Sequence, residues 1–87
     1  MSDFNENFEL LEPILVDGDK TSVITLKKPT VKAMRASFKA PNAFEQNIVL
    51  VKECSNLNLI EIDNLSPIDF QRILDYLGNF IALGPTS

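Results

Sequence analysis

The chain has 87 residues, 45% of them apolar, and its eight basic and twelve acidic side chains give a net charge of −4. This length suits a single domain, and the acidic balance argues against nucleic-acid binding, which depends on clustered Lys and Arg. The sequence contains no His and only one cysteine, Cys54. These counts exclude a His general base, a His-activated nucleophile, an internal disulfide and a thiolate metal cluster. We therefore expect no enzymatic activity, no catalytic residue, and no cofactor or metal site.

Length and hydropathy also bear on location and assembly. The N-terminal segment is acidic where a signal peptide would be basic, and no apolar run approaches the ~18 residues of a membrane span. We therefore expect a soluble, cytoplasmic protein that binds no membrane. A chain this short buries only about 60–65% of the surface that its unfolded state exposes, so we expect it to gain stability from a partner or from further copies of itself.

Charge is distributed in blocks along the chain. Residues 1–19 hold six acids and no base, residues 20–39 hold six bases and no acid, and residues 41–87 hold six acids and two bases. Two interpretations of the basic block stay open at this point. It either meets an acidic partner or packs beside the acidic flanks of its own fold, as exposed charges commonly do.

The first predicted elements are two strands, from Leu10 to Val16 and from Thr21 to Leu26. Between them lies Asp17-Gly18, a pair typical of hairpin turns because Gly accepts a positive φ without steric cost. A two-residue turn would divide the apolar side chains between both faces of the hairpin. A three-residue loop with Gly18 left-handed would gather most of them on one face, so we favour this bulged loop. That face would hold Leu10, Ile14, Val16, Ile24 and Leu26.

A short helix is predicted after the hairpin. Pro29 ends the second strand, and Thr30 is a suitable N-cap for a helix from Val31 to about Phe38. Within this helix Val31, Met34 and Phe38 share a face. The pair Ala40-Pro41 then breaks the chain.

Residues 40–64 are the least certain part of the pattern. Asn42 with Glu45 three residues later fits a capping arrangement, so we predict a second helix from about Ala43 to Glu53. The β-branched run at 48–51 also allows a strand. Residues 55–64 alternate between apolar and polar, which suits a short strand and an irregular helical turn equally well.

The last helix has the clearest signals. Ser66 is its N-cap, Pro67 occupies the first helical position, and Asp69 completes the capping pattern. Gly78 lies inside this helix at a cost of about 1 kcal/mol relative to Ala, and we interpret it as a mark of close helix contact. An apolar stripe follows, formed by Phe70, Ile73, Leu74, Leu77 and Phe80 or Ile81.

Together these elements predict an α+β fold, an N-terminal β-hairpin followed by about three helices of which the last is longest. We expect a flexible lead-in over residues 1–9, one small domain over residues 10–83 and a tail over residues 84–87. No residue or motif in the sequence indicates a catalytic or ligand-binding site. Asp63 and Asp69 could pair as carboxylates, but no third ligand or helper group accompanies them. Cys54 is interpreted as a small buried apolar residue.

Three motifs occur in an order that resembles a known family. They are Glu12 to Gly18 (EPILVDG), Ile24 to Thr30 (ITLKKPT) with Met34-Arg35 after it, and Leu65 to Phe70 (LSPIDF). The small tail assembly chaperones of contractile-tailed, Mu-like bacteriophages typically show a V-D-G hairpin, basic residues before Pro-Thr, and L-S-x-x-D-F before the last helix. The resemblance covers about Leu10 to Leu83, with a more apolar and β-branched middle segment than the family pattern.

The resemblance implies a non-enzymatic function in the host cytoplasm. Members of that family bind the tape measure protein, a long and largely helical chain that sets tail length. They keep it soluble until tail tube subunits polymerise around it, and they are absent from the mature virion. Many are made in a short form and a longer frameshifted form, and this chain is similar to the short one. The partners implied are thus the tape measure protein, further copies of the chain and its own frameshifted form.

An alternative interpretation is a small homo-oligomeric structural or adaptor protein of a phage or prophage. In either case we expect partner contacts from the basic segment and the last helix. The predicted contact residues are Lys27, Lys28, Lys32, Arg35, Tyr76, Phe80 and Ile81.

Overall fold

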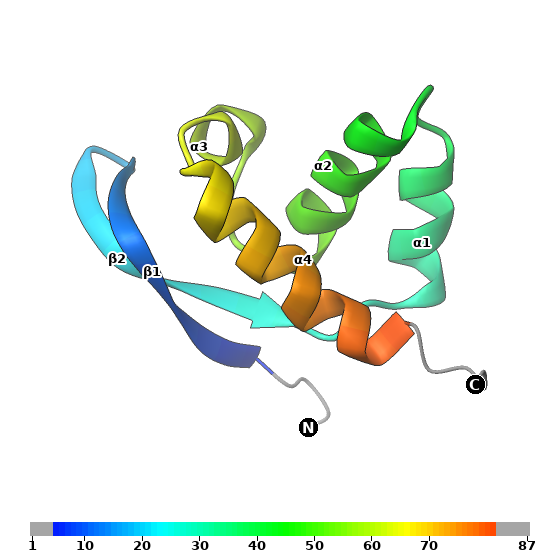
Figure 1. Ribbon diagram of the computed structural model, residues 1–87, viewed down its shortest axis with the longest axis horizontal. Helices are drawn as coiled ribbons and strands as arrows, with labels where there is room; N and C mark the ends of the chain where they lie inside the picture. Colours follow the sequence, from blue (N-terminus) through cyan, green and yellow to red (C-terminus); the bar gives the residue numbers. More distant parts are fainter. Residues whose placement is uncertain (1–4, 82–87) are drawn as a thin grey trace.

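The computed structural model describes residues 5–81 of the chain, with side chains over residues 6–80. An antiparallel two-stranded hairpin is followed by helices (Figure 1). In chain order the elements are β1 (Asn5–Val16), β2 (Asp19–Lys27), α1 (Val31–Phe38), α2 (Ala43–Cys54), α3 (Leu59–Asp63) and α4 (Pro67–Ile81). The predicted α+β fold is confirmed, with the hairpin first and the longest helix last.

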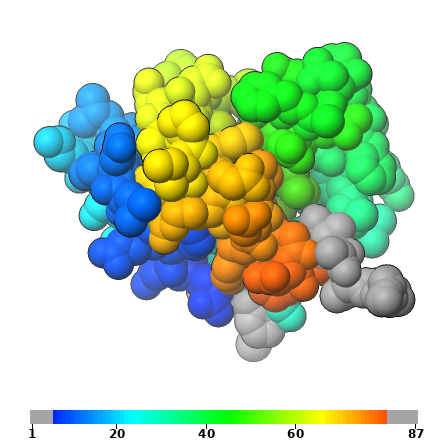
Figure 2. All heavy atoms as spheres, viewed as in Figure 1, coloured from blue at the N-terminus to red at the C-terminus, as the bar shows by residue number. Residues whose placement is uncertain are grey.

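A single core lies where the hairpin meets the helices. Its fully buried side chains come from both halves of the chain: Ile24, Leu26, Val51, Cys54, Ile73 and Leu77. Helix α4 contacts both β1 and α2, and it lies between the hairpin and the α1–α2 pair (Figures 1 and 2). Within residues 5–81, no helix has both the length and the apolar character needed to cross a membrane.

The hairpin turn differs from the predicted one. Val16 pairs directly with Asp19, which leaves a two-residue turn at Asp17-Gly18. Both turn residues have positive φ, 54° and 83°, as a type I′ turn requires. The predicted three-residue loop is therefore wrong. Asp tolerates the left-handed region better than most side chains do, so the pair forms the tighter turn.

The irregularity lies in β1 instead of in the turn. Glu9 pairs with Val23 and Ile14 with Thr21, so four residues of β1 pass a single residue of β2. A bulge of this kind bends the strand and increases its twist. The apolar side chains predicted to share a face all reach the core or pack against it: Leu10, Ile14, Val16, Ile24 and Leu26. The predicted grouping of apolar side chains is thus correct, but the bulge in β1 produces it and not a three-residue turn.

Strand β1 also begins earlier than the pattern indicated. Residues 5–9 belong to the strand and pair with β2, whereas we predicted a lead-in up to residue 9. A contact of Phe8 helps to explain why the strand begins before residue 10. Its ring meets Tyr76 of α4 edge-on, with centroids 5.8 Å apart, and such a contact stabilises both partners beyond simple burial.

Helix α1 has the predicted bounds but buries an unpredicted face. Thr30 caps it, because its side-chain oxygen accepts a hydrogen bond from the Ala33 N–H at 3.1 Å. The buried residues of the helix are the small Ala33 and Ser37. Val31 and Phe38 do share a face, but they are 72% and 66% exposed. Helix α1 packs against α2 and buries its small side chains, whereas Val31 and Phe38 stay exposed and Met34 is half-buried.

The middle segment is helical. Asn42 caps α2 by accepting from the Glu45 N–H at 2.9 Å, and the helix runs to Cys54. Ser55 then forms a lone antiparallel bridge with Leu26 of β2. The undecided stretch that follows becomes α3, which begins with a complete capping box between Asn58 and Glu61. Local caps thus decide between strand and helix here.

Helix α4 begins at Pro67 as predicted, with Ser66 Oγ accepting from the Asp69 N–H at 3.1 Å. The apolar stripe is confirmed, since Ile73 and Leu77 are fully buried. Gly78 differs from its interpretation. A Cβ built on it meets no described atom within 4 Å, so no close helix contact within the described chain explains this glycine.

Replacing Gly78 by Ala is therefore expected to stabilise the isolated protein. The added methyl group meets no clash, and Ala in a helix interior is favoured over Gly by about 1 kcal/mol. Urea unfolding of the Gly78→Ala variant measures this gain. A free energy of unfolding below that of the wild type would show that the helix packs at Gly78 after all.

Candidate functional site

A buried carboxylate joins α4 to the bulge of β1. Asp69 is 0% exposed, and both of its carboxylate oxygens accept the Leu11 N–H at 3.0 Å. Its Oδ2 also accepts the Glu12 N–H at 3.0 Å. These donors lie in the part of β1 that has no partner on β2. The side chain therefore replaces a missing strand partner, which buried backbone N–H groups require.

Arg72 completes this junction from the next turn of α4. Its Nη1 donates to Asp69 Oδ1 at 2.7 Å and to the backbone carbonyl of Glu9 at 3.0 Å. The guanidinium carbon also lies 5.0 Å from the ring centroid of Phe8, within the range of a cation–π contact. One side chain thus neutralises the buried carboxylate and holds the strand where it enters the bulge, at Phe8 and Glu9.

The environment of Asp69 favours its charged form. Burial by itself raises the pKa of this carboxyl, but hydrogen bonds to the carboxylate outweigh burial and hold the pKa below its usual value. The donors, in order of effect, are the backbone of Leu11, the backbone of Glu12, and the side chains of Arg72 and Ser66. Asp69 is therefore a structural anion with its oxygens occupied, and the imagined pair with Asp63 has no role in this arrangement.

We expect Asp69→Asn to lower the free energy of unfolding by about 2–4 kcal/mol, because a neutral amide accepts poorly from two buried N–H groups and leaves Arg72 without its anion. Asp75→Asn is the matched control: Asp75 is exposed, so its loss should change stability by less than about 0.5 kcal/mol.

Wild type and Asp69→Asn should also differ in how the free energy of unfolding depends on pH. The lowered pKa of Asp69 means that its stabilisation is present above the pKa of an unfolded Asp, about 3.9. It is lost as pH falls through the lower folded value. Urea unfolding between pH 3 and pH 7 should show a steeper acid loss for wild type than for Asp69→Asn. Parallel curves would contradict this assignment.

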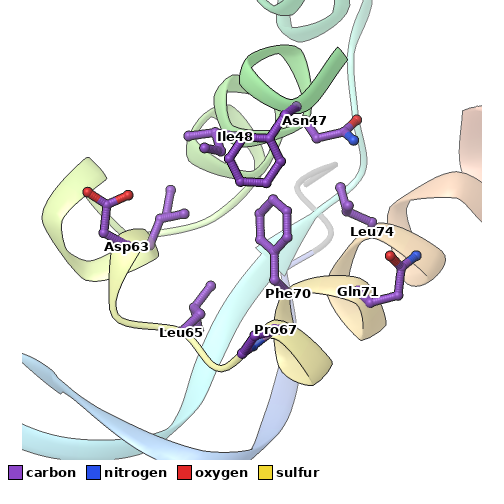
Figure 3. Close-up of a pocket in the computed structure, with 10 residues that line it drawn as sticks. Asn47, Ile48, Asp63, Leu65, Pro67, Phe70, Gln71 and Leu74 are labelled. Carbon is purple, nitrogen blue, oxygen red and sulfur yellow. The ribbon is translucent and has the colours of Figure 1, made fainter. Parts of the chain in front are cut away.

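The opposite flank of α4 forms one wall of an open groove (Figure 3). The groove has a volume of about 410 Å³ and is lined by Phe44, Asn47, Ile48, Ile62, Asp63, Leu65, Pro67, Phe70, Gln71 and Leu74. Phe70 points into it from α4, towards Ile48 and Asn47 on α2. Its ring lies 6.0 Å from that of Phe44, centroid to centroid. Phe44 remains 61% exposed, so an aromatic ring at the groove is left accessible to a partner.

Charge at the groove has one sign. Asp63 is the charged residue among those that line it, and no Lys or Arg does. We call this surface the Phe44–Phe70 groove. Its residues were not among the predicted contact residues: Phe44 lies in the second predicted helix and Phe70 in the apolar stripe of the last, and a single sequence does not give the relative placement of these two helices.

The predicted contact residues lie elsewhere. None of them lines the groove. Tyr76 is half-buried and meets Phe80 edge-on, with centroids 5.4 Å apart. Lys28 Nζ lies 5.8 Å from the centroid of Phe80, so the structure brings the basic segment and the end of α4 together. The side chain of Ile81 lies outside the described residues.

The remaining basic contact residues are exposed at the end of β2 and on α1, namely Lys27, Lys32 and Arg35. Over residues 6–80, the ion pair that the structure contains is Arg72–Asp69.

Cys54 lies in the core as predicted, at the end of α2. Burial raises the pKa of its thiol to about 11; the charge of Lys27 opposes this rise and that of Glu53 adds to it. A thiol with so high a pKa is almost wholly protonated at neutral pH and is a poor nucleophile.

Comparison with known protein families gives a match over most of the chain. The model of a family described as phage tail assembly chaperone proteins, E, or 41 or 14, matches residues 7–82. That match covers all but the first two residues of the hairpin, helices α1 to α4 and the groove. Neither a curated protein nor a solved structure matches the chain.

Proposed function

Because the chain belongs to the family of phage tail assembly chaperone proteins, we propose that it binds the tape measure protein and keeps it soluble until the tail tube polymerises around it. The Phe44–Phe70 groove is the observation that carries this proposal. A groove between two helices, with an exposed aromatic ring, fits the apolar face of a partner helix. A long chain that exposes such faces aggregates unless they are covered.

The net charge of the chain supports the proposal that it keeps its partner soluble. The protein carries a net charge of −4, and net charge keeps a complex soluble through mutual repulsion. The chaperone acts by reversible binding without catalysis. It works in the host cytoplasm and leaves before the particle matures. The motif order described above further supports a contractile-tailed, Mu-like phage as the source and a longer frameshifted form as a companion.

The test is co-expression with the tape measure protein of the same phage, followed by measurement of the soluble fraction and of co-purification. Wild type should hold the tape measure protein in solution. Phe44→Glu should leave most of it insoluble, because a carboxylate replaces the exposed ring at the groove. Ile60→Glu is the matched control, since Ile60 is 72% exposed on α3 and does not line the groove. Equal loss in both variants would contradict a groove-specific function.

A second candidate function is that of a homo-oligomeric structural or adaptor protein. The segregation of charge favours it. Helix α1 and the hairpin turn lie at opposite ends of the molecule (Figure 1). The exposed face of α1 combines Val31 and Phe38 with Arg35, whereas residues 5–19 carry acids and no base. The opposite charges of these two surfaces favour contact between the basic face of α1 in one copy and the acidic strand β1 of the next.

This candidate predicts assemblies that dissociate with salt, because exposed charges are screened within about 8 Å at physiological ionic strength. Light scattering after size exclusion measures the mass at low and high salt. Arg35→Glu should shift the mass to that of the monomer, while Lys52→Glu, on α2, should not. Mass spectrometry of mature particles separates the two functions, since a structural component remains in the particle and a chaperone does not.

A further inference from the structure

Gly78 occupies a position that the contacts of the described residues do not explain. It lies within α4, where Gly costs about 1 kcal/mol relative to Ala. Its φ is not positive, unlike that of Gly18, so the backbone does not require a glycine there. A Cβ at this position meets no described atom within 4 Å. A glycine in a helix lets another backbone approach more closely than any other residue does.

Helical spacing places Gly78 beside the Phe44–Phe70 groove. It follows Leu74 by four residues and Gln71 by seven, and both of these line the groove. Residues at these spacings lie on one face of a helix. Asp69, Arg72 and Tyr76 lie on the other flank of α4, where they contact β1. The face of α4 that lines the groove thus continues as far as Gly78, which has no side chain.

We propose that Gly78 is the point where a helix of the partner crosses α4 at close range, with its apolar side chains entering the Phe44–Phe70 groove. This inference rests on the proposed function, since it describes how the tape measure protein is held. Packed helices lie about 8–10 Å apart, depending on the side chains at the contact. A glycine at the crossing permits the shortest separation, so the partner's side chains reach the groove floor.

The geometry also sets the chemistry of the partner helix. Gly78 and Phe70 are eight residues apart, which is about 12 Å along α4 at ~1.5 Å per residue. An aligned partner helix spans the same length with apolar side chains two turns apart. The charged groups beside it are acidic: Asp63 lines the groove, and Asp75 lies next to Gln71, whose Nε2 donates to it at 3.0 Å. The occupant we expect is therefore an amphipathic helix whose apolar stripe is flanked by Lys or Arg in the part that lies beside Asp63 and Asp75.

The experiment compares Gly78→Leu with Asn79→Leu in the full chain. Asn79 is exposed and points away from the groove side of α4 by helical spacing. Isothermal titration with soluble tape measure fragments gives the affinity, and urea unfolding gives the stability of each variant. We expect Gly78→Leu to weaken binding about tenfold or more, equivalent to about 1.4 kcal/mol, while Asn79→Leu stays within about twofold. Gly78→Ala should bind less tightly although it is more stable, and partial unfolding does not produce that combination.

The outcomes separate this inference from the function on which it rests. If wild type binds no tape measure fragment, both the proposed function and the crossing at Gly78 are wrong. If wild type binds and Gly78→Leu binds equally well, only the crossing is wrong. Asp63→Asn with Asp75→Asn should reduce affinity and its dependence on salt. Unchanged salt dependence in that variant would contradict a partner helix with basic flanks.

Discussion

The fold depends on one buried carboxylate that replaces a missing strand partner. The bulge in β1 leaves the N–H groups of Leu11 and Glu12 without acceptors on β2, and Asp69 supplies both from 58 and 57 residues away. Arg72 neutralises that carboxylate and reaches the Glu9 carbonyl. Because Asp69 and Arg72 both belong to α4, satisfying the bulge also fixes this helix against the hairpin. The Phe44–Phe70 groove then forms on the flank that remains, where α4 meets α2.

Local signals predicted most of the elements, whereas long-range contacts decided the rest. The caps at Thr30, Asn42 and Ser66 lie within three residues of the groups they bind, so a sequence motif reveals them. The bulge in β1 depends on Asp69 of α4, whose carboxylate accepts the Leu11 and Glu12 N–H groups. No local sequence pattern in β1 indicates a contact with a residue so far along the chain. Spacing showed that Val31 and Phe38 share a face, but it could not tell that Ala33 and Ser37 would be buried in their place.

The candidate site was harder to predict for the same reason. Exposure logic favoured Tyr76 and Phe80, yet Tyr76 packs between Phe8 and Phe80 within the chain. Phe44 lies within the second predicted helix, was not among the predicted contact residues, and is 61% exposed. Side chains that satisfy the fold and side chains left for a partner have similar sequence signals. Only the positions of the helices separate them, and here one flank of α4 contacts β1 while the other lines the Phe44–Phe70 groove.

Site-specific photo-crosslinking tests the central claim most directly, that this chaperone holds the tape measure protein in the Phe44–Phe70 groove. A benzophenone amino acid placed at position 44, with the same probe at position 60 as control, would be activated in cells that make both proteins. The account predicts a crosslinked chaperone–tape measure product from position 44 and little or none from position 60. Crosslinks from position 60 in the absence of any from position 44 would contradict it.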